Sequence, residues 1–382
     1  MPQAVTALLW VRVLNAVGSF AIGFLAVLAG PGLTTAALAV FGGAALVSRW
    51  GGAILLDRMA PRGVLVLGLA ATGVALAALT AARTPGQILL ATAATGLAFE
   101  IYEPATTELL ARLTPEHLRE TVFRRFGTWL VAAGAVAGML AAVLLPLGVR
   151  WLIAVDAATC LASAAVARVF LPAQPRPRTE KARRRWRPPA SLVLLTGACT
   201  AYALGYLALV MFTPSLLLQR GAPAWLPGAT LTGAALLAPS AGWLAQRVLR
   251  GRPHLQVLKS SGPVLAVPAL AMAVTREPVA LVAGYVCWSA VNAALMGRWP
   301  ALVAEIAPER DRPRWFAFSG SSWGVAQPLV PGVVALVSTA TGNASAPAPL
   351  TAAPAFLAIS LILLFHPRPS ARPAGAQEPT PV

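Results

Sequence analysis

The sequence predicts an all-α membrane protein with twelve transmembrane helices, arranged as two pseudo-symmetric six-helix bundles. Three observations lead to this fold class. The 382 residues are 57% hydrophobic and only 11% charged, whereas soluble globular proteins carry about 25% charged residues. The apolar residues form runs of about 20, the length with which a helix crosses a bilayer. Two polar motifs recur about 190 residues apart, which indicates a duplicated half.

The twelve apolar runs follow one another along the whole chain. Each must form a helix, because only helices and closed barrels satisfy their backbone hydrogen bonds in lipid. The first run lacks a basic leader and a cleavage-like site followed by polar sequence, so we expect a retained span rather than a signal peptide. The predicted spans are residues 7–29, 33–56, 63–82, 86–110, 123–147, 149–171, 191–217, 226–249, 257–275, 278–303, 315–339 and 347–366.

The positive charges lie mainly on one side of the predicted spans. Of the 30 Lys and Arg residues, 25, from Arg49 to Arg372, fall in the loops and tail of one side. Four fall in the opposite loops, and Arg12 lies inside the first span. Cytoplasmic loops carry the excess of positive charge, so we expect a multi-pass protein of the inner or plasma membrane with both termini in the cytoplasm. Scattered loop charges also argue against nucleic-acid binding, which needs a cationic soluble face.

One polar segment separates the two groups of six spans. Residues 172–190 are rich in proline and arginine, which predicts an extended cytoplasmic basic linker. Binding of acidic lipids is an alternative use of its charge. The predicted domains are therefore an N-terminal bundle at 1–171 and a C-terminal bundle at 191–366. Residues 367–382 are predicted to be a disordered cytoplasmic tail.

Catalytic and metal-binding chemistry finds little support in the sequence. The three cysteines and three histidines are scattered, without the spacing of metal ligands. No phosphate-binding loop of the ATP-driven kind is present, and no loop carries the clustered acids or metal ligands of a membrane enzyme. We expect no cofactor, no metal and no catalytic residues. The expected partners are the lipid bilayer, a small-molecule substrate and protons, and we expect a monomer.

The two halves share motifs at the same ends of equivalent spans. Asp57-Arg58 after the second span corresponds to Gln246-Arg247 after the eighth. Pro115-Glu116 after the fourth span corresponds to Pro308-Glu309 after the tenth. Both halves keep the same orientation, so they are parallel repeats related by an axis along the membrane normal.

With these residues the sequence resembles the major facilitator superfamily over essentially its full length. The stretches "YEPA" and "WLIAVDAAT" are similar to the drug-efflux branches of that superfamily, although Met139 replaces the proline of the antiporter signature. The resemblance implies a secondary transporter that works by alternating access of two rocking halves. It also implies a cytoplasmic gate at the degraded signature after span two and its echo after span eight, formed by Asp57, Arg58, Arg62, Gln246 and Arg247.

Acidic residues inside the predicted spans are the strongest functional signal. Glu100 and Glu103 lie one helical turn apart in an apolar run, where a carboxylate costs at least ~2.5–3.5 kcal/mol. They must therefore face a water-filled cavity or a charged partner. A role in proton or substrate binding explains why two acidic residues are present in the span despite this energetic cost. The alternative is a structural ion pair with one of the nearby arginines, namely Arg12, Arg119, Arg124 or Arg125.

Two further residues belong to this acidic region. Pro104 directly follows Glu103 and is expected to kink the fourth span, because proline removes a helical hydrogen bond. Asp156 in the sixth span is either a second protonation site or a polar contact between helices.

The resemblance also implies that spans one, four, seven and ten line a central cavity. The candidate cavity residues are Arg12, Asn15, Phe20, Tyr102, Tyr202, Tyr206, Trp288, Asn292 and Met296. Aromatic residues at helical spacing can alternatively serve helix packing or an interfacial belt. An acidic wall opposite an aromatic wall favours proton-coupled efflux of amphipathic or apolar molecules. Metabolite uptake or facilitated export by the same fold is the alternative function.

Overall fold

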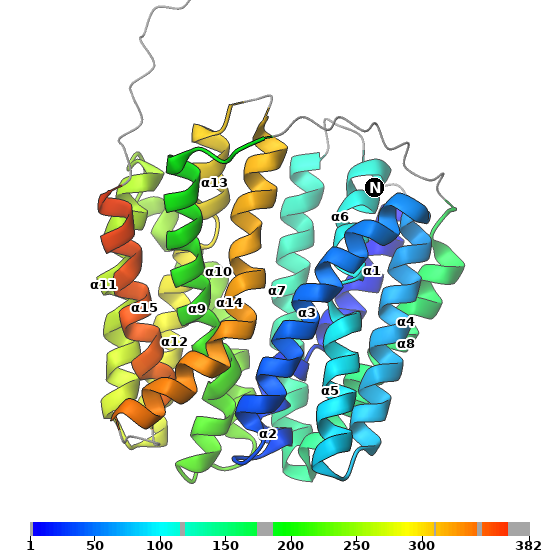
Figure 1. Ribbon diagram of the computed structural model, residues 1–382, viewed down its shortest axis with the longest axis horizontal. Helices are drawn as coiled ribbons and strands as arrows, with labels where there is room; N and C mark the ends of the chain where they lie inside the picture. Colours follow the sequence, from blue (N-terminus) through cyan, green and yellow to red (C-terminus); the bar gives the residue numbers. More distant parts are fainter. Residues whose placement is uncertain (1–2, 115–118, 174–185, 309–310, 342–345, 366–382) are drawn as a thin grey trace, which may run out of the picture.

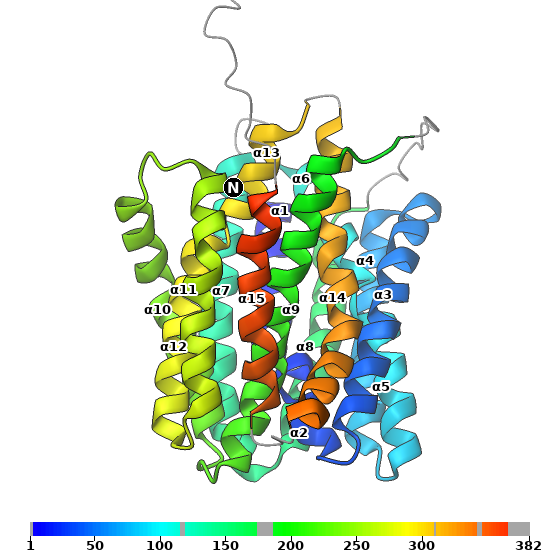
Figure 2. The same cartoon turned by 60° about the vertical axis from the view of Figure 1, so that its left-hand side comes forward.

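The computed structural model describes residues 3–114, 119–173, 186–308, 311–341 and 346–365. Every regular element in these residues is a helix. Figures 1 and 2 show the helices running roughly parallel to one another, with the blue-to-teal N-terminal half beside the green-to-red C-terminal half. The predicted all-α membrane fold is confirmed. Most of the predicted linker, the predicted tail and Pro115-Glu116 lie outside the described residues.

The N-terminal half extends to Phe170 and the C-terminal half begins at Ala190. The elements of the first half are α1 (Gln3–Val17), α2 (Ala21–Ala29), α3 (Thr34–Arg58), α4 (Pro61–Ala81), α5 (Pro85–Phe99), α6 (Tyr102–Leu113), α7 (Arg119–Leu144), the 3-10 helix η2 (Leu145–Leu147) and α8 (Val149–Phe170). Those of the second half are α9 (Ala190–Gln219), α10 (Leu226–Val248), α11 (His254–Val274), α12 (Pro278–Leu295), α13 (Arg298–Ile306), α14 (Arg312–Thr341) and α15 (Pro347–Leu364).

Nine helices of the described residues are long and apolar enough to cross a membrane. The other three predicted spans are the first and the fourth, each built from two shorter helices, and α10. The structure is therefore consistent with twelve spans, although hydropathy and length identify nine of them.

Two equivalent spans are broken at equivalent places. The fourth span is interrupted between α5 and α6 at Glu100-Ile101, and the tenth between α12 and α13 at Met296-Gly297. In both halves a proline, Pro104 or Pro300, lies four residues after the start of the break. Proline has no N–H to offer the carbonyl four residues earlier, so each break begins where that hydrogen bond is missing. The predicted kink is present, and it lies before Pro104 rather than at it.

In the part of the chain that the structure describes, three pairs of helices join the halves, and the two ends of the molecule differ in charge. We call the end that carries α6, α13 and the C-terminal residues of α3 and α10 the cationic end, because most loop arginines belong to it. Between the halves, α2 packs against α9, α3 against α14 and α7 against α10. Towards the cationic end, α6 packs against α1, α3 and α4, and α13 packs against α11 and α14. These partners belong to the same half in each case.

Glycines allow the helices to approach closely between the halves. A Cβ atom on Gly228 of α10 would lie 2.1 Å from the backbone nitrogen of Ala142 in α7, and one on Gly42 of α3 would lie 2.7 Å from the Cα atom of Pro328 in α14. No side chain fits at these positions without movement. Both contacts lie towards the end opposite the cationic end, so the halves are closed together there.

Candidate functional site

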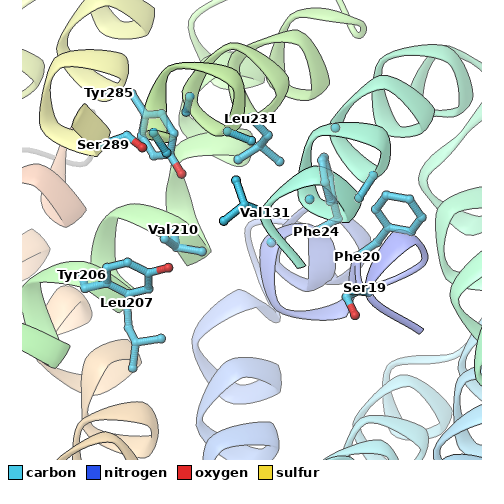
Figure 3. A pocket seen from close by; sticks show the side chains of 18 of the residues that line it. Ser19, Phe20, Phe24, Val131, Tyr206, Leu207, Val210, Leu231, Tyr285 and Ser289 are labelled. Carbon is cyan, nitrogen blue, oxygen red and sulfur yellow. The ribbon is translucent and has the colours of Figure 1, made fainter. Parts of the chain in front are cut away.

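A cavity of about 570 Å³ lies between the two halves, midway along the helices. It is lined by the α1–α2 junction, by Arg49 and Glu100, and by side chains of α7, α9, α10, α12 and α14. In Figure 3, Tyr206 and Tyr285 of the C-terminal half lie across the cavity from Phe20 and Phe24 of the N-terminal half. The cavity has the size of a small-molecule site, and its wall is mainly apolar and aromatic.

Glu100 is the acidic residue that lines this cavity. Its side chain is 13% exposed, and its Oε2 atom lies 3.3 Å from Nη2 of Arg49. Glu100 lies at the break between α5 and α6, where its backbone N–H donates to the hydroxyl of Ser48 in α3 at 3.1 Å. This hydrogen bond holds Glu100 in place. Glu100 therefore forms an ion pair that borders the cavity and is not sealed from it.

Arg49 connects this ion pair to the other half of the protein. Its Nη1 atom donates to the backbone carbonyl of Gly320 in α14 at 3.2 Å, and its side chain remains 36% exposed. Arg49 was expected among the loop cations, but it lies inside α3, more than two turns before the helix ends at Arg58. Without Arg49, the loops at the cationic end still carry most of the positive charges.

Glu103 has a separate partner, so the two glutamates do not act as a mutual pair. Its carboxylate binds Arg12 of α1, and the guanidinium group of Arg12 lies 4.9 Å from the ring centroid of Tyr102. Arg12 is buried, whereas the Glu103 side chain is 43% exposed. The pair of Glu103 with Arg12 corresponds to the alternative to proton or substrate handling, a structural ion pair with a nearby arginine. The side chains of Arg119, Arg124 and Arg125 lie outside the described residues.

A chain of buried polar contacts leads from Arg12 to Asp156. Arg12 donates to Asn15 Oδ1 at 3.4 Å, and Asn15 Nδ2 donates to Cys160 Sγ at 3.2 Å. Cys160 in turn contacts Asp156 Oδ1 at 3.6 Å. The other carboxyl oxygen of Asp156 accepts the backbone N–H of Phe20 at 3.0 Å. Asp156 is 3% exposed, and these contacts tie α8 to the break in the first span.

The predicted aromatic residues form one connected cluster in the C-terminal half. Tyr206 contacts Tyr202, Trp288 and Trp323, with ring centroids 5.1–6.3 Å apart. Tyr202 is buried and donates its hydroxyl to Asn292 Oδ1. Of these residues, Tyr206 and Trp323 line the cavity, whereas Tyr202, Trp288 and Asn292 lie behind them.

The remaining candidates lie at different distances from the cavity. Phe20 lines it, whereas Arg12, Asn15 and Tyr102 are buried inside the N-terminal half. Met296 is 52% exposed and does not line the cavity.

Several residues that line the cavity were missed by the sequence analysis. Ser289 of α12 and Gln327 of α14 contribute polar side chains, together with Trp323. The signal for α14 was the spacing of Gly320, Trp323 and Gln327, which share one helix face. Hydropathy alone does not single out this face.

The predicted gate residues lie at the cationic end and are mostly exposed. Asp57 and Arg58 end α3, and Gln246 and Arg247 lie near the end of α10. These four side chains are exposed, and the guanidinium of Arg247 lies 3.9 Å from the ring centroid of Trp243. Arg62 donates to the carbonyl of Arg168.

A second cavity of about 550 Å³ lies at the end opposite the cationic end. It is lined by residues that surround the start of α3, the end of α9, the end of α14 and the start of α15. Within the described part of the chain, its lining includes hydroxyl side chains such as Thr35 and Ser338 and no charged residue. Among the described residues there is no group of three or more His, Cys, Asp or Glu side chains that could hold a metal ion.

The fold is similar to that of solved transporters. A bacterial homolog of the human lysosomal transporter Spinster, in an inward-facing and unoccupied conformation, aligns with a TM-score of 0.68 and 14% identity, covering 95% of this chain and 94% of that chain. The peptide transporter POT in complex with sulfate aligns with a TM-score of 0.75, at the same identity and coverage. No curated protein sequence matches the chain. The family model of the Major Facilitator Superfamily matches residues 5–297, and the chain therefore belongs to this superfamily, whose members are transporters rather than enzymes.

Proposed function

We propose that this chain is a proton-coupled exporter of small amphipathic or apolar molecules, of the drug-efflux type, in the inner or plasma membrane. The observation that carries the proposal is the Glu100–Arg49 ion pair at the wall of the central cavity. An ionisable pair within the membrane is costly, and this one borders a space where both a proton and a substrate can reach it.

The contacts of Arg49 suggest how a proton is coupled to movement. Protonation of Glu100 removes the negative charge that holds one side of the Arg49 guanidinium. The other side of that group binds the carbonyl of Gly320 in the opposite half. A proton on Glu100 therefore changes the environment of a contact between the halves, and a substrate beside Glu100 and Arg49 competes with that proton.

The composition of the cavity wall supports the proposed class of substrate. Arg49 and Glu100 supply one charge of each sign, and the rest of the lining is mainly aromatic and aliphatic, as at Phe24, Tyr206 and Leu231. A molecule without net charge, with an apolar body and one or two polar groups, matches this wall. A strongly cationic molecule matches this wall less well, because the positive charge of Arg49 repels it.

The conformation fits loading from the cytoplasm. With the cationic end in the cytoplasm, as the positive-inside rule predicts, the close contacts at Gly42 and Gly228 hold the halves together on the outer side. In this state an exporter takes up its substrate. The outward-facing state then requires the contacts at Gly42 and Gly228 to separate.

Uptake or facilitated export of a metabolite is the second candidate. The pair of opposite charges in the cavity favours it, because a zwitterionic metabolite presents both charges to Arg49 and Glu100. The direction in which an imposed proton gradient moves the substrate separates the two functions.

The test uses purified full-length protein in liposomes with an imposed proton gradient and radiolabelled chloramphenicol, a neutral amphipathic molecule. We expect the wild type to move chloramphenicol against the direction of proton flow. The Glu100→Gln variant should lose gradient-driven accumulation by about 5- to 150-fold, the usual range of coupling between two sites. It should still exchange labelled for unlabelled compound across the membrane.

Glu108→Gln is the matched control for this experiment. Glu108 lies in the same span and also forms an ion pair with an arginine, Arg112, at 2.6 Å, but the pair is exposed on the surface. The control should behave as the wild type. Gradient-driven accumulation by Glu100→Gln at the wild-type rate would contradict the coupling role of Glu100.

A further inference from the structure

We infer that Asp156 is the positioning residue that keeps the first span broken and directs α2 onto the C-terminal half. In this role its carboxyl group stabilises the conformation in which the halves are closed at the end opposite the cationic end. The inference rests on the proposed function only in assuming a transport cycle, and its test needs neither a substrate nor a proton gradient.

The break in the first span leaves a backbone donor that Asp156 satisfies. Helix α1 ends at Val17 and α2 begins at Ala21. In a continuous helix the N–H of Phe20 donates to the carbonyl four residues earlier. Here it donates to the carbonyl of Gly18 at 2.8 Å and to Oδ2 of Asp156 at 3.0 Å. Phe20 is the N-cap residue of α2, and a carboxyl oxygen that accepts the N–H of an N-cap residue is a favourable cap, as in a capping box.

Close packing of α8 against the break holds this cap in register. A Cβ atom on Gly18 would lie 1.9 Å from Oγ1 of Thr159, less than one helical turn along α8 from Asp156. Helix α8 packs against both α1 and α2. The first span is therefore bent over α8 at the point where the carboxyl group is available.

The second carboxyl oxygen is fixed as well. Oδ1 of Asp156 contacts Cys160 Sγ, which also accepts from Asn15 Nδ2 of α1. With one oxygen tied to α1 through Cys160 and the other to the start of α2, the Asp156 side chain spans the break. It thereby sets the angle between α1 and α2.

The repeat does not require this break. The seventh span, which occupies the equivalent place in the C-terminal half, is one continuous helix, α9, from Ala190 to Gln219. The first span differs because it has Gly18 and a buried acid beside it. The break is therefore a separate feature of the N-terminal half.

The direction of α2 decides how the halves close. Helix α2 packs against α9, and Phe20, Gly23 and Phe24 line the central cavity. Without the Asp156 oxygen, the Phe20 N–H is buried without this acceptor. Extending α1 through residues 18–20 restores helical hydrogen bonding, but it turns α2 away from α9. Loss of the cap should thus open the end that is closed in this structure.

The experiment measures the distance between the ends of α2 and α9 in full-length protein in nanodiscs. Spin labels are attached through Gly32→Cys and Gln219→Cys, both at exposed positions. Cys287→Ser removes the exposed native cysteine, whereas Cys160 and Cys199 are buried. Protein without the two introduced cysteines reports any labelling of these buried residues.

Asp156→Ala should increase the ratio of long to short distances by about fivefold, the shift that loss of one ordinary hydrogen bond produces. Asp156→Thr should give the same shift, because its hydroxyl is one bond shorter and does not reach Phe20. This variant serves if Asp156→Ala does not fold. Asp156→Asn keeps an acceptor oxygen and should restore a distribution close to the wild type.

Ser163→Ala is the matched control on the same helix, since Ser163 is buried and its hydroxyl has no hydrogen-bond partner among the described residues. It should leave the distances unchanged. The inference is overturned if Asp156→Ala and Asp156→Thr keep the wild-type distribution. It is also overturned if Asp156→Asn opens the end as far as Asp156→Ala does, or if Ser163→Ala opens it equally.

Discussion

Glu100, Glu103 and Asp156 each have a different partner. Glu100 pairs with Arg49, Glu103 with Arg12, and Asp156 with the backbone N–H of Phe20. Only the first of these contacts borders the central cavity and continues, through Arg49, to the opposite half. The three acids are chemically similar, but their surroundings differ. Glu100 is the proposed coupling residue, whereas Glu103 and Asp156 hold helices together.

The sequence indicated the three acids because a carboxylate inside an apolar run is conspicuous. It did not indicate Arg49 as the partner of Glu100, since the two residues are 51 positions apart and meet only through the packing of α3 against α5 and α6. It also did not indicate which aromatic side chains would reach the cavity. That depends on helix rotation, which is set by contacts that a single sequence does not display.

The buried hydrogen bond between Tyr202 and Asn292 supports the aromatic wall from behind. Asn292→Ala removes the acceptor of a buried hydroxyl, so we expect the free energy of unfolding to fall by about 1–2 kcal/mol. In a Tyr202→Phe background the same substitution should cost less, because no hydroxyl is then left without a partner. Steric trapping in bicelles measures these free energies, and equal costs in both backgrounds would mean that the hydrogen bond does not contribute.

Helix breaks position the site at the scale of secondary structure. The breaks in spans four and ten follow from Pro104 and Pro300, whose positions in the sequence are visible. The break in span one has no proline and depends on Gly18, Thr159 and Asp156 from two different helices. The sequence could therefore predict the first kind of break and not the second.

Close approach of α7 and α10 is a second feature at this scale, and it yields a prediction. Gly228→Ala places a methyl group 2.1 Å from the Ala142 backbone nitrogen, so the halves cannot close fully at that end. We expect a several-fold rise in the reaction of Gln219→Cys with a membrane-impermeant thiol reagent, in a Cys287→Ser background.

Gly233→Ala is the matched control on the same helix, because a Cβ atom at Gly233 meets nothing within 4 Å. It should react at the rate of the parent protein. If Gly228→Ala also reacts at the parent rate, the contact of α7 with α10 does not control access to this end of the molecule.

At the scale of the whole molecule, hydropathy and internal repetition predicted two bundles of six helices, and the resemblance of the signature motifs pointed to the superfamily. Apolar runs of span length, cations concentrated in alternate loops and motifs repeated at nearly the same offset describe two parallel bundles before any contact is known. These signals can be read from the sequence because the thickness and apolarity of the bilayer constrain every span in the same way. The conformational state was not predictable in this way, since alternating states of one transporter share a sequence.

The most direct test of the account is the proton balance of substrate binding. Chloramphenicol is added to full-length protein in weakly buffered nanodiscs, and a pH indicator records protons released. If proton and substrate compete at the Glu100–Arg49 pair, the wild type releases protons on binding and Glu100→Gln releases none. Glu103→Gln, altered at the Arg12 pair, releases as many as the wild type. Equal release from Glu100→Gln and the wild type, or no release from the wild type, would contradict the account.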